Sequence, residues 1–123
     1  MTDPNFILLY VASPATSADF YARVLGRPPV ESSPTFVMFR LESGVMLGLW
    51  TRDGVNPAPT AGGGGGELAI AVDGDATVDA LHSAWRDTGV TIAQAPLKLD
   101  FGRSFLALDP DGHRLRVFAP AMA

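Results

Sequence analysis

The chain has 123 residues, of which 47% are hydrophobic and 18% are charged, and it contains no cysteine. This length suits one compact unit with a core, and the lack of cysteine excludes disulfides, thiolate metal ligands and a cysteine nucleophile. The formal net charge of −4, with no basic tract, argues against nucleic acid or an anionic membrane as a partner. No signal-peptide pattern and no bilayer-length apolar run is present, so we expect a soluble, cytoplasmic protein.

The first half of the chain predicts the order β-α-β-β-β. An apolar run at residues 6–12 predicts a buried strand. Ser13 and Pro14 are typical of a helix start, and this helix should run to about Leu25 and end at Gly26. A short strand at residues 30–32 and two strands at 35–41 and 45–51 complete this half.

Residues 53–66 form the one segment of low complexity. They include Pro57, Pro59 and five consecutive glycines, Gly62 to Gly66. Such a composition cannot bury enough apolar surface to fold by itself, so we predict a flexible linker or a mobile loop. The glycines do not form a phosphate loop, because no Lys-Ser or Lys-Thr pair follows them.

After this segment the order of elements repeats. Residues 67–72 predict a strand, Asp75 is expected to cap a helix that ends at Gly89, and residues 90–93 predict a short strand. A hairpin is predicted over residues 101–118, around Asp-Gly at 111–112. Strand alternation assigns a core face to Leu106, Leu108, Leu115 and Val117. The opposite face is assigned to Phe101, Arg103, Phe105, Arg114, Arg116 and Phe118.

The two halves also match residue by residue. Residues 44–50 align with 112–118, and residues 6–11 align with 67–72. Repeats of this kind are supersecondary units that bury little alone. We therefore predict an α+β fold in which two tandem β-α-β-β-β modules form a cleft-shaped mixed sheet with helices on the outside. A single domain, 1–123, would hold module one (about 5–52), the linker (53–66) and module two (about 67–119).

Two motifs carry a resemblance to a known superfamily. The helix sequence Asp-Phe-Tyr-Ala-Arg-Val-Leu-Gly at 19–26 and the turn Asp-Pro-Asp-Gly-His at 109–113 resemble the vicinal oxygen chelate superfamily. Its members include glyoxalase I, extradiol dioxygenases and bleomycin-resistance proteins. Residues 9–11, 49–50 and 101–105 look most similar to phenazine-resistance proteins. This resemblance implies binding of a flat aromatic antibiotic without a metal, and a homodimer.

Metal-dependent members of this superfamily place His or Glu at four strand positions. The resemblance carries these positions onto Phe6, Gly48, Glu67 and Arg116. Only Glu67 offers a ligand atom, and an arginine would repel a cation. The two histidines lie elsewhere, on the second helix and at the hairpin turn. We therefore expect no metal, no cofactor and no catalytic residue.

The predicted ligand-binding residues combine aromatic rings with arginines. Rings favour stacking with a flat ligand, and an arginine fork matches a carboxylate. Gly48 should leave room for a planar ring, whereas Trp85 has the helical spacing of a core residue. Arg116 is also expected to pair with Glu67. The predicted ligand contacts are Tyr10, Phe36, Met46, Gly48, Trp50, Glu67, Phe101, Arg103 and Arg116.

The function predicted from these features is metal-independent sequestration of a planar aromatic molecule such as a phenazine-like antibiotic. One alternative is an enzyme of the same fold, either a metal-dependent lyase or dioxygenase or a metal-free modifying enzyme. Another is a subunit or regulatory domain with no small ligand. Metal content and product analysis separate the enzyme hypotheses from the binding hypothesis.

Overall fold

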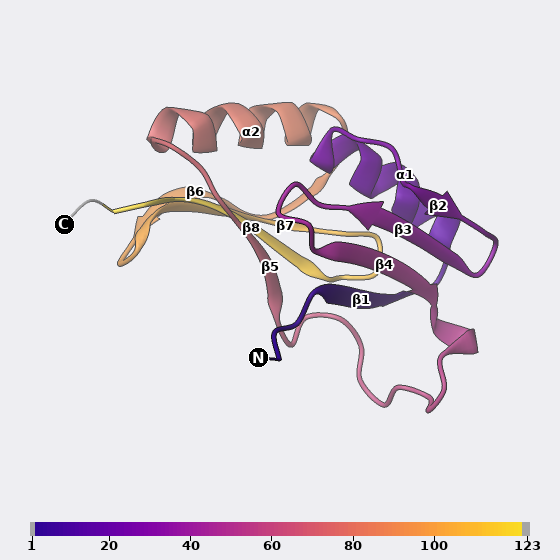
Figure 1. Ribbon diagram of the computed structural model, residues 1–123. Helices are drawn as coiled ribbons and strands as arrows, with labels where there is room; N and C mark the ends of the chain where they lie inside the picture. Colours follow the sequence, from indigo (N-terminus) through magenta and orange to yellow (C-terminus); the bar gives the residue numbers. More distant parts are fainter. Residues whose placement is uncertain (1, 122–123) are drawn as a thin grey trace. The chain divides into compact units, whose positions relative to one another are not determined.

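The computed structural model describes residues 2–121, which divide into a first unit ending at Gly62 and a second unit starting at Gly63 (Figure 1). The first unit contains β1 (Phe6–Val11), α1 (Pro14–Leu25), β2 (Glu31–Ser32), β3 (Phe36–Arg40), β4 (Met46–Thr51) and the short 3-10 helix η1 (Arg52–Gly54). The second contains β5 (Glu67–Ala71), α2 (Asp75–Asp87), β6 (Thr91–Leu99), β7 (Gly102–Leu108) and β8 (Arg114–Pro120). Within residues 2–121 no helix is long and apolar enough to cross a membrane.

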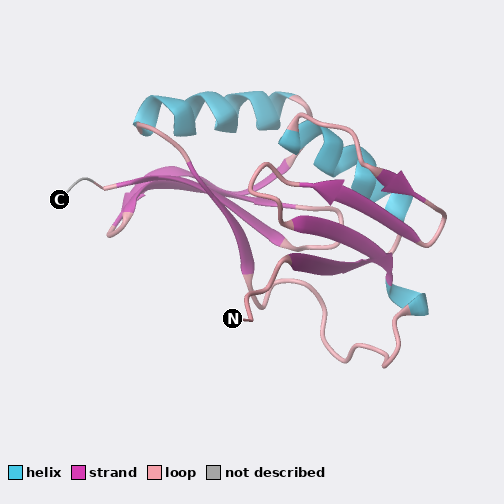
Figure 2. Cartoon of the chain, in the orientation of Figure 1, coloured by secondary structure: helices cyan, strands magenta, loops and turns pink. Residues whose placement is uncertain are grey.

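In the first unit a four-stranded sheet has one face covered by α1 (Figure 2). The strand order is β1-β4-β3-β2, with β1 parallel to β4 and the other pairs antiparallel. The helix begins as predicted, because the Ser13 hydroxyl accepts a hydrogen bond from the Thr16 amide at 3.2 Å. It ends at Gly26, whose φ of 69° suits glycine. The buried side chains of this layer include Phe20, Tyr21, Val37, Phe39, Leu47 and Leu49.

The second unit repeats this arrangement. Its strand order is β5-β8-β7-β6, again with one parallel pair, and α2 packs on the sheet. The Phe105 ring is fully buried and makes edge contacts with Trp85 and His82 of α2, with centroid distances of 5.4 and 5.5 Å. Trp85 is therefore a core residue, as its spacing predicts. The α+β fold of two β-α-β-β-β modules is confirmed, whereas the predicted cleft stays a prediction.

The start of α2 differs from the prediction. Gly74 occupies the N-cap position with a φ of 78°, and Asp75 is the first helical residue, with no side-chain cap. A carboxylate in the first turn still favours the helix, because it lies near the positive end of the helix dipole. The helix ends at Asp87, and Gly89 follows it with a φ of 89°.

The strand predicted at residues 90–93 is much longer, since β6 runs from Thr91 to Leu99. Pro96 hides this strand in the sequence because proline cannot donate a hydrogen bond to a sheet. The position of β6 at the sheet edge tolerates it, and the pairing with β7 shifts register between Ile92 and Gln94 and again between Gln94 and Leu97. Such irregularities are common at sheet edges.

The hairpin of β7 and β8 also differs from the prediction, because the side chains that share a face of the sheet are not the predicted ones. A two-residue turn at Asp-Gly would place Leu106 and Leu115 on one face. Instead Leu108 pairs with Arg114 across a longer loop, so Phe105 lies opposite Val117 and Leu106 lies opposite Arg116. Changing the register by one residue moves every side chain of a strand to the other face.

The low-complexity segment is anchored at several points. It begins with η1, and Val55 is buried. Within the first unit, Nη2 of Arg52 donates a hydrogen bond to the Ala61 carbonyl oxygen at 3.2 Å. In the second unit, a Cβ atom placed on Gly63 would lie 2.7 Å from Nδ1 of His113, so this glycine allows a close approach to the hairpin loop.

Candidate functional site

One face of the first sheet gathers aromatic and methionine side chains. The parallel pairing sets Tyr10 beside Trp50 and Leu8 beside Gly48. The antiparallel pairing then sets Phe36 beside Trp50. We call this surface the aromatic face; it comprises Phe6, Leu8, Tyr10, Phe36, Met38, Met46, Gly48 and Trp50. The five contacts predicted from the first half of the chain therefore lie on one face.

The aromatic face is only partly covered in the structure. Phe6 and Leu8 are 41% and 44% exposed, and Trp50 is half-buried. The rings of Tyr10 and Trp50 meet edge to face, with centroids 6.2 Å apart and planes at 77°. Rings held this way present both faces and edges to a flat molecule, which is the geometry that aromatic contacts prefer.

The space expected beside Gly48 is occupied by the side chains of Phe36 and Leu8. A Cβ atom placed there would lie 2.7 Å from Cζ of Phe36 and 2.8 Å from Cδ2 of Leu8. The absence of a side chain lets the Phe36 ring lie over β4. Gly48 therefore shapes the aromatic face by letting Phe36 lie over β4, and its contact with a ligand stays a prediction.

The second sheet carries a charged group that we call the arginine cluster, made of Glu67, Ser104, Arg114 and Arg116. Nε and Nη2 of Arg116 donate to the two carboxylate oxygens of Glu67 at 2.7 and 2.9 Å. Nη1 of Arg116 donates to Oγ of Ser104, which is fully buried, at 2.9 Å. Nε of Arg114 also donates to Glu67, at 2.9 Å. The predicted pairing of Arg116 with Glu67 is confirmed.

The electrostatics of this cluster follow from its composition. Hydrogen bonds from Arg116 lower the pKa of Glu67 to about 2, against partial burial and with help from Arg114. The same hydrogen bond to Glu67 raises the pKa of Arg116. At neutral pH one carboxylate therefore faces two guanidinium groups, and the cluster keeps one positive charge.

Aromatic rings border the arginine cluster. The Phe101 and Phe118 rings meet edge to face with centroids 5.6 Å apart, and Cζ of Arg116 lies 5.8 Å from the Phe101 centroid. Phe101 is 44% exposed. Guanidinium groups are attracted to ring faces at such distances. The predicted contacts Glu67, Phe101 and Arg116 are thus brought together in one place.

Arg103 lies on the other face of the second sheet. It pairs with Ala119 in the register, and its Nε donates to Oδ1 of Asp79, on α2, at 2.8 Å. The expectation that Arg103 and Arg116 share a face is wrong, because the hairpin loop is longer than the two-residue turn that the alternation assumed.

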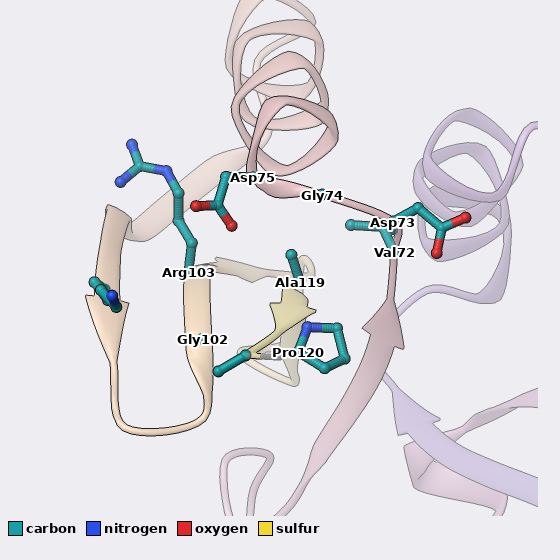
Figure 3. Close-up of a pocket in the computed structure, with 10 residues that line it drawn as sticks. Val72, Asp73, Gly74, Asp75, Gly102, Arg103, Ala119 and Pro120 are labelled. Carbon is teal, nitrogen blue, oxygen red and sulfur yellow. The ribbon is translucent and has the colours of Figure 1, made fainter. Parts of the chain in front are cut away.

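A pocket of about 610 Å³ lies where α2 begins, and Arg103 is part of its wall (Figure 3). Figure 3 shows Arg103 and Asp75 on the helix side of the pocket. Small residues and backbone make up much of the remaining wall, and no aromatic ring contributes. A flat apolar molecule would find no stacking partner there. The lining residues are Val72, Asp73, Gly74, Asp75, Lys98, Gly102, Arg103, Ala119, Pro120 and Ala121.

The residues at the four metal positions do not fit a divalent cation. Phe6 and Gly48 offer no ligand atom, and Arg116 is itself a cation. Both carboxylate oxygens of Glu67 already accept hydrogen bonds from arginines. Within residues 2–121 no group of three or more histidine, aspartate or glutamate side chains is arranged to hold a metal ion.

Two residues of the arginine cluster were missing from the predicted contacts. Arg114 precedes Arg116 by two positions, and this spacing on a strand already indicates a shared face. That signal was available in the sequence. No such signal pointed to Ser104, because the face on which it lies relative to Arg116 depends on the length of the hairpin loop.

The sequence pattern of the Glyoxalase/Bleomycin resistance protein/Dioxygenase superfamily matches residues 4–117, and the chain belongs to this superfamily. The phenazine antibiotic resistance protein EhpR of Enterobacter agglomerans is 31% identical over 119 residues, which cover 93% of this chain and 89% of EhpR. A protein of Agrobacterium tumefaciens, solved in solution by NMR, is 52% identical with a TM-score of 0.90, covering 99% of this chain and all of that one. A glyoxalase-related enzyme of Fulvimarina pelagi shares the fold at 22% identity, with a TM-score of 0.86 over 97% of this chain and 88% of that one.

Proposed function

We propose that this protein binds and sequesters a planar aromatic molecule of the phenazine kind, and thereby confers resistance to it. The aromatic face carries this proposal, because half-buried rings and methionines on one sheet face are suited to a flat apolar ligand. The similarity to EhpR, which extends over most of both chains, supports the choice of phenazines.

Binding in this proposal needs neither a metal nor a covalent step. Each favourable ring contact contributes roughly 0.5–1.5 kcal/mol beyond the apolar area it buries. Three or four such contacts would contribute about 1.5–6 kcal/mol in addition to that burial, compared with the roughly 8 kcal/mol of a micromolar complex. The predicted homodimer and cytoplasmic location are compatible with this role and stay predictions.

Equilibrium dialysis of the full chain against phenazine, with a chelator present, tests the proposal. We expect saturable binding and a ligand that is recovered chemically unchanged. Replacing Trp50 with alanine should weaken binding about tenfold, the loss of one or two ring contacts. The matched control is Trp85→Phe, which keeps the core filled beside Phe105 and should stay within twofold of the wild type.

The same pair of tryptophans provides an optical readout, since the chain contains only two. In the Trp85→Phe variant all tryptophan emission comes from Trp50, and this emission should decrease with ligand concentration along the same binding curve that dialysis measures. Absence of saturable binding would refute the proposal. Equal loss of affinity in the two variants would show that Trp50 is structural, and recovery of a modified ligand would favour an enzyme.

A further inference from the structure

The pocket at the start of α2 has the size of a small-molecule site. Its volume of about 610 Å³ lies within the range of roughly 300–1,000 Å³ that is usual for such sites. All of its lining residues belong to the second unit. None of them belongs to the aromatic face, so a molecule bound in this pocket would contact a separate set of side chains with a different chemistry.

Two cations lie beside each other in this pocket. Lys98 of β6 is directly opposite Arg103 of β7 in the strand register, so both side chains leave the same face of the sheet. Like charges in this position repel each other. The Asp79 carboxylate accepts a hydrogen bond only from Nε of Arg103. Among the described residues, the terminal nitrogens of Arg103 and the Lys98 ammonium group have no partner, so both are available to an anionic group.

A carboxylate lies near these two cations on the helix. Asp75 precedes Asp79 by four residues, and this spacing places both side chains on the face of α2 that Arg103 contacts. Figure 3 shows Asp75 on the same side of the pocket as Arg103, whereas Asp73 lies on the opposite side. Asp75 is exposed and forms no ion pair with any described residue. The pocket therefore offers positive charge and, near it, a negative charge.

The rest of the pocket wall is small and partly apolar. Val72, Ala119 and Pro120 contribute its apolar side chains. Gly74 has open space where a side chain would stand. A short aliphatic group suits this wall better than a ring, because no aromatic side chain is present for stacking.

We propose that this pocket binds a free α-amino acid with a small aliphatic side chain. The carboxylate of the ligand pairs with Lys98 and Arg103, and its ammonium group pairs with Asp75. An α-amino acid carries both charged groups on one carbon atom, which matches the nearby opposite charges of the pocket. A simple anion would be repelled by Asp75, and a simple cation by Lys98 and Arg103. This inference adds a second ligand to the proposed function and does not depend on it.

NMR spectroscopy of the isotope-labelled full chain tests this inference with three probes that share one carbon skeleton. L-valine carries both charges, isovalerate lacks the amino group, and isobutylamine lacks the carboxylate. We expect L-valine to shift the amide signals of Gly74 and Gly102 in a saturable way. Its affinity should be about tenfold higher than that of either other probe, the contribution of one hydrogen bond between charged groups.

Two variants separate the roles of the opposite charges. In Lys98→Gln the affinity for L-valine should fall about tenfold, whereas that for isobutylamine should not fall. In Asp75→Asn the preference for L-valine over isovalerate should disappear. The matched controls are Arg86→Gln and Asp87→Asn, which remove the same charges at the other end of α2. Both controls should keep the preferences of the wild type.

Three results would overturn the inference and leave the proposed function intact. The first is the absence of saturable shifts with L-valine. The second is isovalerate binding as tightly as L-valine to the wild type, because the pocket would then select any anion. The third is an equal effect in the variants and their controls, because net charge would then decide the affinity. Unchanged signals outside the pocket show that each variant keeps the fold, so a lost preference reports on the pocket itself.

Discussion

The ion pairs of Glu67 predict a specific acid sensitivity. The pKa of this carboxyl is lowered from 4.5 to about 2 in the folded protein, mainly by Arg116. A carboxyl with a lowered folded-state pKa stabilises the fold above its unfolded pKa, and this contribution is lost as the pH falls from about 4.5 to about 2. The shift corresponds to about 3 kcal/mol at most, and partial exposure to water reduces the expected effect to about 1–2 kcal/mol.

Replacing Glu67 with glutamine isolates this contribution. The variant leaves Arg114 and Arg116 adjacent without their counterion, so it should be about 1–2 kcal/mol less stable at pH 7. Below pH 2 the wild-type carboxyl is protonated as well, and the two proteins should converge. Other carboxylates titrate in both proteins and cancel when the two are compared.

Urea unfolding followed by circular dichroism, at pH 7, 4.5, 3 and 2, measures the difference between wild type and variant. We expect a constant gap from pH 7 to 4.5 that closes at lower pH. A gap that is the same at every pH would refute the assignment of the shift to Glu67. The exposed pair of Asp87 with Arg86 supplies the control, because Asp87→Asn should show no gap at any of these pH values.

Two further predictions concern the backbone. Gly102→Ala should destabilise the protein by about 3 kcal/mol or more in urea unfolding, because φ is +135° and a Cβ atom would overlap the Ala119 carbonyl oxygen; a change below 1 kcal/mol would show that this contact relaxes easily. Ser13→Ala should cost about 1 kcal/mol through loss of the cap on the Thr16 amide, and Ser13→Thr should restore most of it, as thermal unfolding can measure. An alanine variant as stable as the wild type would show that the cap contributes little.

The residues of the aromatic face could be grouped from the sequence because side chains two positions apart on a strand point to the same side of the sheet. Residues of β4 alternate between the buried Leu47 and Leu49 and the ligand-facing candidates Met46, Gly48 and Trp50. No turn had to be crossed within one strand. The relation to Tyr10 and Phe36 followed from the same alternation in their own strands, and the register confirms it.

The prediction for the second sheet failed where a turn lay between the residues compared. Arg103 and Arg116 belong to different strands, and their relative face depends on whether the loop between the strands holds an even or an odd number of residues. The Asp-Gly signal favoured a two-residue turn. The prediction of β6 was also too short, because Pro96 and the register shifts interrupt the alternation of side chains that indicates a strand.

Composition, periodicity and local capping were enough to predict the α+β class, the repeat of two β-α-β-β-β modules and the alternation of side chains along each strand. The motifs at residues 19–26 and 109–113 carried the resemblance to the family. The tertiary structure was needed to show that Arg114 joins Arg116 at Glu67, how Phe36 fills the space over Gly48, and that Arg103 pairs with Asp79 on α2. These relations join residues far apart in the chain, and their geometry depends on strand register and loop length, which no local pattern encodes.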